Sequence, residues 1–373
     1  MKRPSFTLGI EEEFQVVDPE TRSLRSHIQE MFDKGEDRLG ELIKREMHDS
    51  VIEVGTPICR DIQEARREVT RLRGELLKLC GENQLALAAA GTHPFTHWSE
   101  VPIVDAPRYI KIVSDLGMVA RANLIFGLHV HVAIEDDEQR IHILNQARYF
   151  LPHVLALSVN SPFWCGRETG WKSYRTKVFE RFPRTGIPDP FRSWGEYAEL
   201  INLLVQADCI DTPKKIWWDL RIHPTFPTIE YRICDVPMRV DETICIAAIF
   251  QALTLTLWKL HTKNMSWRLY RRSLIMENKT RAARYGLDDK LIDFGITEQI
   301  PTRELIEELL DLITDSADEL GCREEIEYAH TIMSTGTGAD RQLKVWRDTN
   351  NLESVVDYII EETSHGVPVP SSV

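Results

Sequence analysis

Several common catalytic signatures are missing from this 373-residue sequence, which narrows the chemistry that it can perform. It has no GxxxxGK[ST] phosphate-binding loop and no GxGxxG segment after a strand, so neither common nucleotide-binding fingerprint applies. It also lacks the GxSxG turn that presents a serine nucleophile in α/β-hydrolases. Any nucleotide or acyl chemistry in this chain must therefore use a different set of residues.

Cysteine pairs, basic runs and long apolar runs are absent too. The seven cysteines form no CxxC pair, which indicates reduced thiols in a cytosolic protein. No run rich in Lys or Arg stands out, and the formal charge of −13 argues against nucleic acid as a partner. The longest uncharged run, 243–258, is too short for a membrane span and predicts a buried helix capped by Asp241. The N-terminal segment has no apolar stretch before its acidic triplet, so we expect no secretory signal and a cytoplasmic protein.

The hydrophobic pattern predicts helices and one-sided strands. Helical periodicity marks 61–80, 302–320 and 352–363. Strict alternation, with an apolar face opposite a face of Glu, His and Arg, marks 6–17, 126–134, 217–223 and 228–234. One-sided burial is typical of antiparallel sheets that pack against helices. We therefore predict an α+β fold, a curved antiparallel β-sheet with helices on one face, as a single domain over 1–365 with a disordered tail at 366–373.

The polar faces of these strands carry the candidate site. They hold Glu11, Glu13, His129, His131, Arg221, Glu230 and Arg232, and Lys is absent from all four faces. Each pair alone has a structural explanation, such as an exposed strand face, hydrogen-bonded histidines or a cross-strand ion pair. Together they favour carboxylates and an imidazole that bind Mg²⁺ or Mn²⁺, with arginines that bind phosphate or carboxylate oxygens.

A second acidic segment runs from Glu46 to Glu53. The two carboxylates cannot share one flat strand face, so a turn near His48 and Asp49 is needed to bring them together. Glu53 is the stronger candidate of the two, and Asp49 is a further one. Glu12 lies on the apolar side of its strand, where it could sit at an edge or support the ligands from behind.

Nine motifs, spread over nearly the whole chain, resemble a known family. They are GIEEEFQVVD at 9–18, IEVGTP at 52–57, GTHPF at 91–95, GLHVHV at 127–132, SYRTKVFERFPRTGIP at 173–188, WWDLRIHP at 217–224, IEYRICDVP at 229–237, RAARYGL at 281–287 and GTGADRQLKVWR at 336–347. In this order they resemble the type 2 glutamate–cysteine ligase family, the carboxylate–amine ligases. More distantly, Glu-x-Glu-Phe, Gly-x-His-x-His and Glu-x-Arg look like the catalytic domain of glutamine synthetase, a fold shared with guanidino kinases.

The resemblance implies a role for each motif residue. Metal ligands would be Glu11, Glu13, Glu46, Glu53, His129 and Glu230. His131 and Arg232 would contact the nucleotide phosphates, Arg221 would face the transferred phosphoryl group, and Arg175 would bind the acid substrate. The implied cofactors are ATP and Mg²⁺ or Mn²⁺, the implied substrates are glutamate and an amine such as cysteine, and the implied assembly is a homodimer.

The reaction implied by the resemblance is an ATP-dependent ligation. A carboxylate takes the γ-phosphoryl group to form an acyl phosphate, and an amine then displaces phosphate to give an amide. The segment 165–190, rich in Arg, Gly and Pro, is the candidate lid that excludes water from this intermediate. Two alternatives stay open: a phosphotransferase like the guanidino kinases, which would release a phosphorylated product, and a non-catalytic nucleotide- or metal-binding module.

Overall fold

An antiparallel sheet forms the centre of the structure, a computed structural model that describes residues 2–26 and 28–369. Its seven strands follow the order β10-β11-β5-β1-β3-β2, with β4 paired to the end of β1 on the edge opposite β3, and all pairings in it are antiparallel. The strands are β1 (Leu8–Val17), β2 (Ile43–Arg45), β3 (Val51–Gly55), β4 (Ala86–Ala88), β5 (Gly127–Ala133), β10 (Leu220–Ile222) and β11 (Thr228–Asp235). Three small two-stranded sheets pair β6 (Phe163–Trp164) with β7 (Arg167–Glu168), β8 (Thr185–Gly186) with β9 (Trp217–Trp218), and β12 (Lys290–Asp293) with β13 (Glu298–Pro301).

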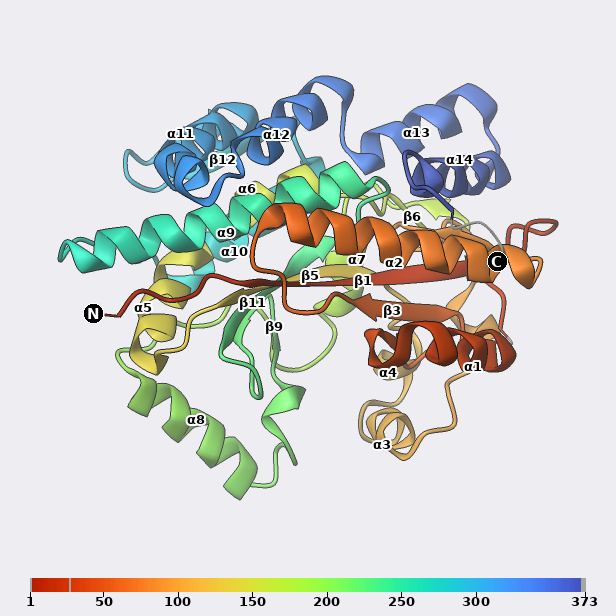
Figure 1. Ribbon diagram of the computed structural model, residues 1–373, viewed down its shortest axis with the longest axis horizontal. Helices are drawn as coiled ribbons and strands as arrows, with labels where there is room; N and C mark the ends of the chain where they lie inside the picture. Colours follow the sequence, from red (N-terminus) through yellow and green to blue (C-terminus); the bar gives the residue numbers. More distant parts are fainter. Residues whose placement is uncertain (1, 27, 370–373) are drawn as a thin grey trace.

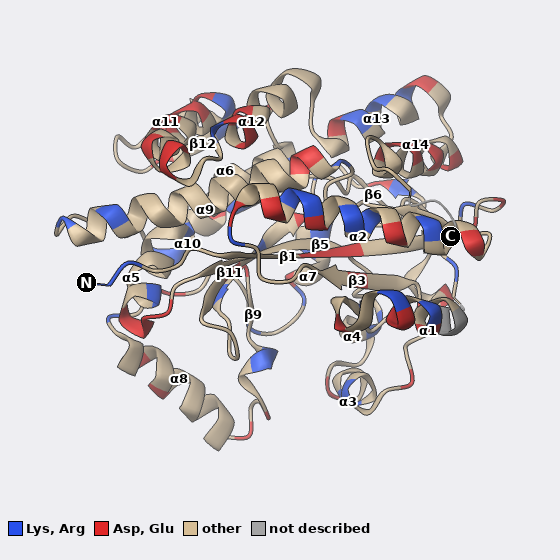
Figure 2. Ribbon diagram, viewed as in Figure 1, with Lys and Arg blue, Asp and Glu red and all other residues tan. Residues whose placement is uncertain are grey.

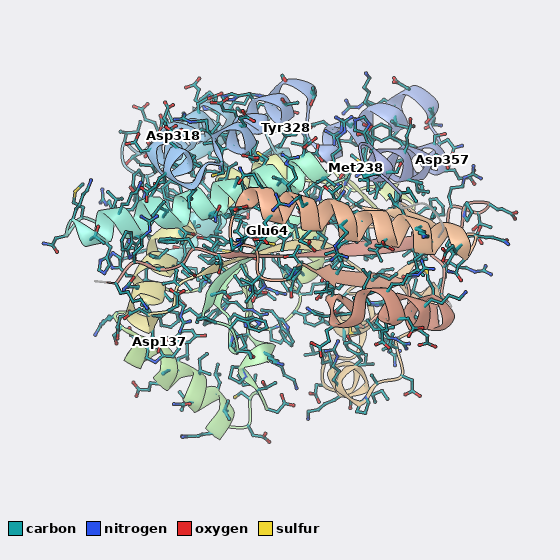
Figure 3. All side chains as sticks on the ribbon, in the orientation of Figure 1. Glu64, Asp137, Met238, Asp318, Tyr328 and Asp357 are labelled. Atoms are coloured by element: carbon teal, nitrogen blue, oxygen red, sulfur yellow. The ribbon has the colours of Figure 1, made fainter. Side chains whose placement is uncertain are left out.

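Helices cover the apolar face of the sheet in two layers. The helices of the chain are α1 (Ile28–Leu39), α2 (Ile62–Glu82), α3 (Pro107–Leu116), α4 (Met118–Arg121), α5 (Asp137–Ala147), α6 (Leu151–Ser158), α7 (Tyr174–Phe179), α8 (Trp194–Gln206), α9 (Val240–Thr262), α10 (Arg272–Tyr285), α11 (Thr302–Leu320), α12 (Arg323–Thr335), α13 (Gly338–Thr349) and α14 (Leu352–Ser364). The inner layer includes α2, α6 and α9, which contact β1, β11 and β5. The outer layer includes α11, α12 and α14, marked by Asp318, Tyr328 and Asp357 (Figure 3). On the other side of the sheet lie α3, α4 and α8, so the prediction of helices on one face alone is wrong (Figure 1).

The predicted alternation produces the core. Ile10 on β1, Val130 on β5 and Ile229 on β11 are at most 1% exposed and belong to one cluster with the inner helices. Full burial of such a side chain contributes about 1.5–3 kcal/mol, so these rows fix which face of the sheet points inward. Charged side chains are spread over the outer helices, while α9 carries few along its middle (Figure 2).

The apolar run at 243–258 forms the buried helix that was predicted. By length and composition α9 could cross a bilayer, but 83% of its most apolar window is buried within the protein, as expected of a core helix. The prediction that Asp241 caps this helix is wrong, because α9 begins at Val240, one residue before Asp241, and its N-cap is Arg239. The Arg239 amide donates to Glu242, and Asp241, in the first turn, pairs with Arg66 of α2. An acidic residue there still interacts favourably with the helix dipole.

Most of the other predicted elements are confirmed. The helices at 61–80, 302–320 and 352–363 are α2, α11 and α14, and the strands at 6–17, 126–134 and 228–234 are β1, β5 and β11. The strand predicted at 217–223 is divided at Asp219, whose amide donates to Gly186 of β8 and whose carboxylate pairs with Lys279. In the predicted tail, Val367 is 9% exposed and packs in the core, and 370–373 lie outside the described residues.

Candidate active site

The strand register gathers the predicted polar residues into one patch on the face away from α2 and α9. Successive strands pair without a shift along most of their length, so side chains two residues apart line up in rows across the sheet. The opposed pairs are Glu11–His129, Glu13–Glu53, His131–Glu230 and Glu230–Arg221. The prediction that these residues share one face of the sheet is therefore confirmed.

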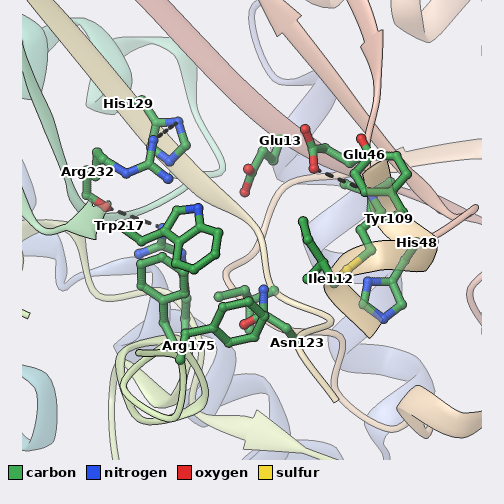
Figure 4. Close-up of a pocket in the computed structure, with 15 residues that line it drawn as sticks. Glu13, Glu46, His48, Tyr109, Ile112, Asn123, His129, Arg175, Trp217 and Arg232 are labelled. Atoms are coloured by element: carbon green, nitrogen blue, oxygen red, sulfur yellow. Dashed lines mark hydrogen bonds between the residues drawn. The ribbon is translucent and has the colours of Figure 1, made fainter. Parts of the chain in front are cut away.

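A cavity of about 130 Å³ opens over part of this patch. In Figure 4, His129 and Arg232 lie on one side of it and Glu46 on the other, with Glu13 between them. The lining also contains apolar and aromatic side chains, which include Met47, Tyr109, Ile112, Phe179, Phe182 and Trp217. The cavity therefore combines charged groups with a large share of apolar surface.

The acid cluster consists of Glu13, Glu46 and Glu53. The chain turns between β2 and β3, as expected from the sequence, and brings the Glu46 carboxyl group within hydrogen-bond reach of Glu53. Burial raises the pKa of Glu13 and of Glu46 to about 7 and that of Glu53 to about 8, and repulsion between neighbouring carboxylates adds to each shift. Once they lose their protons, these buried and mutually repelling carboxyl groups are oxygen ligands suited to a hard divalent cation.

The histidine cluster consists of Glu11, His131 and Glu230. One ligand atom from each residue lies within 4.8 Å of the other two. His131 Nδ1 is 3.1 Å from the Thr228 hydroxyl, and its buried Nε2 has no hydrogen-bond partner among the described residues and lies 3.6 Å from Glu11 Oε2. Two carboxylates and an unpartnered imidazole nitrogen fit a divalent cation.

His129, which the resemblance assigned as a metal ligand, lies beside this cluster. Its Nδ1 is 3.4 Å from Glu11 Oε2 and 3.5 Å from Arg232 Nη1. Burial, and then the charge of Arg232, lowers the pKa of His129 to about 3, so the ring is neutral and one of its nitrogens can bind a cation. The structure thus groups His131 with the two carboxylates, and the ligand role of His129 stays a prediction.

Two arginines hold Glu230. Arg221 donates from Nε to Glu230 Oε2 at 2.6 Å and from Nη2 to Oε1 at 3.1 Å, and Arg232 Nη1 pairs with the same Oε1. Glu230 is fully buried, which alone would raise its pKa, but Arg232 and Arg221 together hold that pKa well below the usual range. The site therefore presents a permanently charged carboxylate between two guanidinium groups.

Arg175 enters the cavity from the first turn of α7. Its guanidinium donates to the carbonyl oxygens of Ile233 and Arg232, both at 3.3 Å, and its buried Nε has no partner among the described residues. The group lies against Gly127, where an added Cβ would be 2.2 Å from Nη2. Only glycine leaves room for Arg175 at this position.

Lys44 is a site residue that the sequence did not reveal. Its Nζ lies 2.9 Å from Glu11 Oε1 and 2.7 Å from Glu53 Oε1, so it connects the histidine cluster with the acid cluster. It is absent from the four predicted strands because it comes from β2, a strand of three residues. A segment of three residues is too short to show the alternation of a strand. The only sequence feature that pointed to this region was the pair of acidic residues on either side of the turn.

The other two candidates lie apart from the cavity. Asp49 is half-buried in the turn after Glu46 and does not line the cavity. Glu12 is buried on the opposite side of β1, where its carboxylate pairs with Arg73 of α2 at 2.9 Å and accepts from the Thr243 hydroxyl of α9 at 2.6 Å. Glu12 therefore joins the sheet to the inner helices.

Known proteins resemble this chain along nearly its whole length. A protein of Solibacter usitatus, provisionally named glutamate–cysteine ligase 2, is 58% identical over 99% of this chain and 96% of its own length. A protein of Sorangium cellulosum with the same provisional name is 52% identical over 97% of each chain.

Solved structures of ligases share the fold. The glutamate–cysteine ligase of Francisella tularensis in complex with AMP has a TM-score of 0.72 at 13% identity, over 99% of this chain and 91% of that one. A bifunctional glutathione synthetase of Pasteurella multocida has a TM-score of 0.70 at 14% identity, over 96% of this chain and 52% of that one. The profile of the glutamate-cysteine ligase family 2 matches residues 7–358. Since that match covers nearly the whole sequence, and close relatives carry the same name, the chain belongs to the glutamate–cysteine ligase family 2.

Proposed function

We propose that this protein is an ATP-dependent carboxylate–amine ligase that activates glutamate as an acyl phosphate and transfers it to an amine, with cysteine as the first candidate. Family membership supports an ATP-dependent carbon–nitrogen ligase. The observation that carries the proposal is the pair of clusters on one sheet face, the acid cluster and the histidine cluster, flanked by Arg175, Arg221 and Arg232.

Both clusters fit Mg²⁺ or Mn²⁺. Glu13, Glu46 and Glu53 would hold one ion, and Glu11, Glu230 and an imidazole of the HxH motif would hold another. When bound, such ions neutralise a polyphosphate and orient its γ-phosphorus. The protein's own contribution is to supply anionic ligands from adjacent strands, so that their spacing is set by the sheet.

The arginines bind the reacting anions. The Arg232 guanidinium lines the cavity, where it can donate to phosphoryl oxygens, and Arg221 supports it through the shared Glu230. Arg175, whose Nε has no partner, anchors the carboxylate of the acid. An oxygen of the substrate carboxylate attacks the γ-phosphorus, the bond to the bridging oxygen breaks, and ADP leaves.

The apolar part of the cavity lining protects the intermediate. Phe179, Phe182 and Trp217 line the cavity, and the first two belong to the segment 165–190 that we propose as the lid. A neutral amine nitrogen attacks the acyl carbon, inorganic phosphate leaves with its bridging oxygen, and the nitrogen loses a proton as the amide forms. Exclusion of water favours the amine over hydrolysis.

The nucleoside of ATP has a separate place along the same face. A cavity of about 420 Å³ is lined by His223 and Phe226 of the β10–β11 turn and by Trp194 and Tyr197 of α8. His223 stacks on Phe226 at 4.6 Å and lies 5.3 Å from His131. A base stacked there would direct its phosphates toward the histidine cluster and leave the cavity beside Arg175 to the acid.

Three finer proposals accompany this function. The order of the motifs supports a binding mode like that of glutamine synthetase, in which the reactants lie along the polar face of the sheet. The whole chain would be one catalytic domain, and two copies would form a homodimer. Light scattering at micromolar concentration tests the last of these, and a monomeric mass would contradict it.

The function is tested by product analysis with a panel of amino acids and amines. We expect ADP, inorganic phosphate and an amide, formed only when acid and amine are both present and abolished by EDTA. Accumulation of ADP with a stable phosphorylated substrate would favour the phosphotransferase instead. Nucleotide binding without turnover across the panel, at full metal occupancy, would favour the non-catalytic module.

A further inference from the structure

A second cavity, of about 240 Å³, lies on the helical side of the sheet, away from the active site. It is formed by the chain around the start of α6, the segment 263–271 between α9 and α10, the β12–β13 turn and α11. These elements lie on the opposite side of the sheet from α3, which borders the active site (Figure 1). No residue is common to the linings of the two cavities. We call this space the aromatic cavity.

Aromatic rings from separate parts of the chain converge on the aromatic cavity. Tyr149 lies 5.2 Å from Tyr270 and 5.8 Å from Trp267, measured between ring centroids. Phe150 lies 5.0 Å from Trp267, and Phe294, which is not part of the lining, lies 5.3 Å from Tyr270. Trp267 and Tyr270 come from the segment 263–271 and are only half-buried, so their rings border a space that solvent can reach.

Two carboxylates, Asp293 and Glu308, line the same cavity. Within residues 2–26 and 28–369, neither forms an ion pair with Lys, Arg or His, and Asp293 Oδ1 accepts only the Gly295 amide, at 2.6 Å. After burial, the charges of Asp293 and Glu308 contribute to the raised pKa of Tyr149, which shows that both act on the aromatic wall. The exposed Arg268 lies 5.5 Å from the Tyr270 centroid, and the buried Arg148 donates to the Tyr270 carbonyl oxygen at 3.1 Å.

Two residues of the lining, Trp267 and His153, have a buried side-chain nitrogen without a hydrogen-bond partner among the described residues. Trp267 Nε1 is inaccessible to solvent and has no hydrogen-bond partner among the described residues. A buried N–H group without an acceptor is costly, and such groups usually find a partner. A ligand that carries an oxygen acceptor beside its cationic centre would supply one.

We propose that the aromatic cavity binds a small organic cation of the alkylated-ammonium class, independently of the active site. Several aromatic rings around one space attract a cation that is weakly hydrated, and the carboxylates of Asp293 and Glu308 add charge complementarity. An inorganic divalent ion fits poorly, because the walls offer rings rather than oxygen ligands. A neutral ligand of the same shape would lack the charge attraction to Asp293 and Glu308.

Choline and its neutral carbon analogue, 3,3-dimethylbutan-1-ol, test the proposal because they share shape and hydroxyl group and differ in charge. Calorimetric titration of the full chain should show choline binding about tenfold or more tightly than the alcohol, as expected for a desolvated cation over aromatic faces. Equal affinities, or no choline binding in the millimolar range, would overturn the proposal.

Two variants locate the bound cation. Asp293→Asn keeps the acceptor for the Gly295 amide and removes only the charge, so it should weaken choline binding about tenfold and leave the alcohol unaffected. Phe226→Ala, in the proposed nucleoside cavity, is the matched control and should leave choline binding unchanged. If ADP displaces choline, or if Asp293→Asn binds it like the parent, the cation lies elsewhere and the proposal is wrong.

Discussion

Metal binding to the acid cluster should release protons at near-neutral pH. Burial and mutual repulsion raise the pKa of Glu13 and Glu46 to about 7 and of Glu53 to about 8. At about pH 6.5 the cluster therefore retains most of its protons, whereas a bound cation needs the carboxylates ionised. We expect the addition of Mn²⁺ to chelator-treated protein to release about two protons per ion bound to this cluster.

Calorimetry in two buffers measures this number directly. At the same pH, the difference in binding enthalpy between buffers with large and small ionisation enthalpies gives the protons released. Glu53→Gln removes the carboxyl group with the most strongly raised pKa of the three, so it should reduce the number by about one. Glu100→Gln, at an exposed position, is the matched control and should leave it unchanged.

One result would refute this reasoning. If Mn²⁺ binds with the same heat in both buffers, no proton leaves, and the carboxylates of the acid cluster are either already ionised or not ligands. Loss of proton release in Glu53→Gln without a loss of affinity would show that the proton comes from this cluster while the ion lies elsewhere.

Three further predictions follow from the same site. Since the acid cluster has pKa values above the ordinary 4.5, the metal-free folded state keeps protons that the unfolded state has lost, so its melting temperature should fall as pH rises from about 7.5 to 8.5, and a flat or rising curve would contradict this. Below about pH 7 the buried histidines, such as His48 with its pKa lowered to about 4, act in the opposite sense, because they bind a proton only in the unfolded state. Arg232→Lys keeps the charge but loses the planar fork, so ADP formation should fall roughly 100-fold with little change in melting temperature, and a rate near the parent's would remove Arg232 from the phosphoryl site. Glu230→Gln should lose turnover and also about 3–5 kcal/mol of unfolding free energy, because two buried guanidinium groups lose their charged partner. An unchanged melting curve would show that Arg221 and Arg232 find other partners.

The parts of the site that lie on long strands could be predicted from the sequence. On β1, β5 and β11 the period of two places Glu11 beside Glu13 and His129 beside His131, whatever the rest of the fold does. Which imidazole nitrogen faces the carboxylates depends on rotamers and on cross-strand neighbours. His131 has Thr228 on one nitrogen and Glu11 near the other, a choice that no local pattern encodes.

The parts that could not be predicted depend on short or distant segments. Lys44 lies on a strand of three residues and reaches Glu11 across β3, so its position depends on how that hairpin closes. Lys44 also reduces the repulsion between the two clusters, because its ammonium group lies within hydrogen-bond distance of one carboxylate from each. The sequence alone does not indicate what balances the charge of the buried carboxylates, because Lys44 lies in a segment too short to show a strand pattern.

Glu12 shows how the fold fixes the register on which the whole site depends. Glu11, Glu12 and Glu13 are consecutive, so a slip of one residue in β1 would exchange the site face with the core face. The partner of Glu12 is Arg73, 61 positions away on α2 and fully buried. A slip would bring Glu11 or Glu13 opposite Arg73 in its place, but it would also move Ile10 and Phe14 out of the core, at a cost of about 1.5–3 kcal/mol for each side chain. The apolar row on either side of Glu12 thus opposes the alternative register, and it keeps Glu11 and Glu13 on the face where the clusters form.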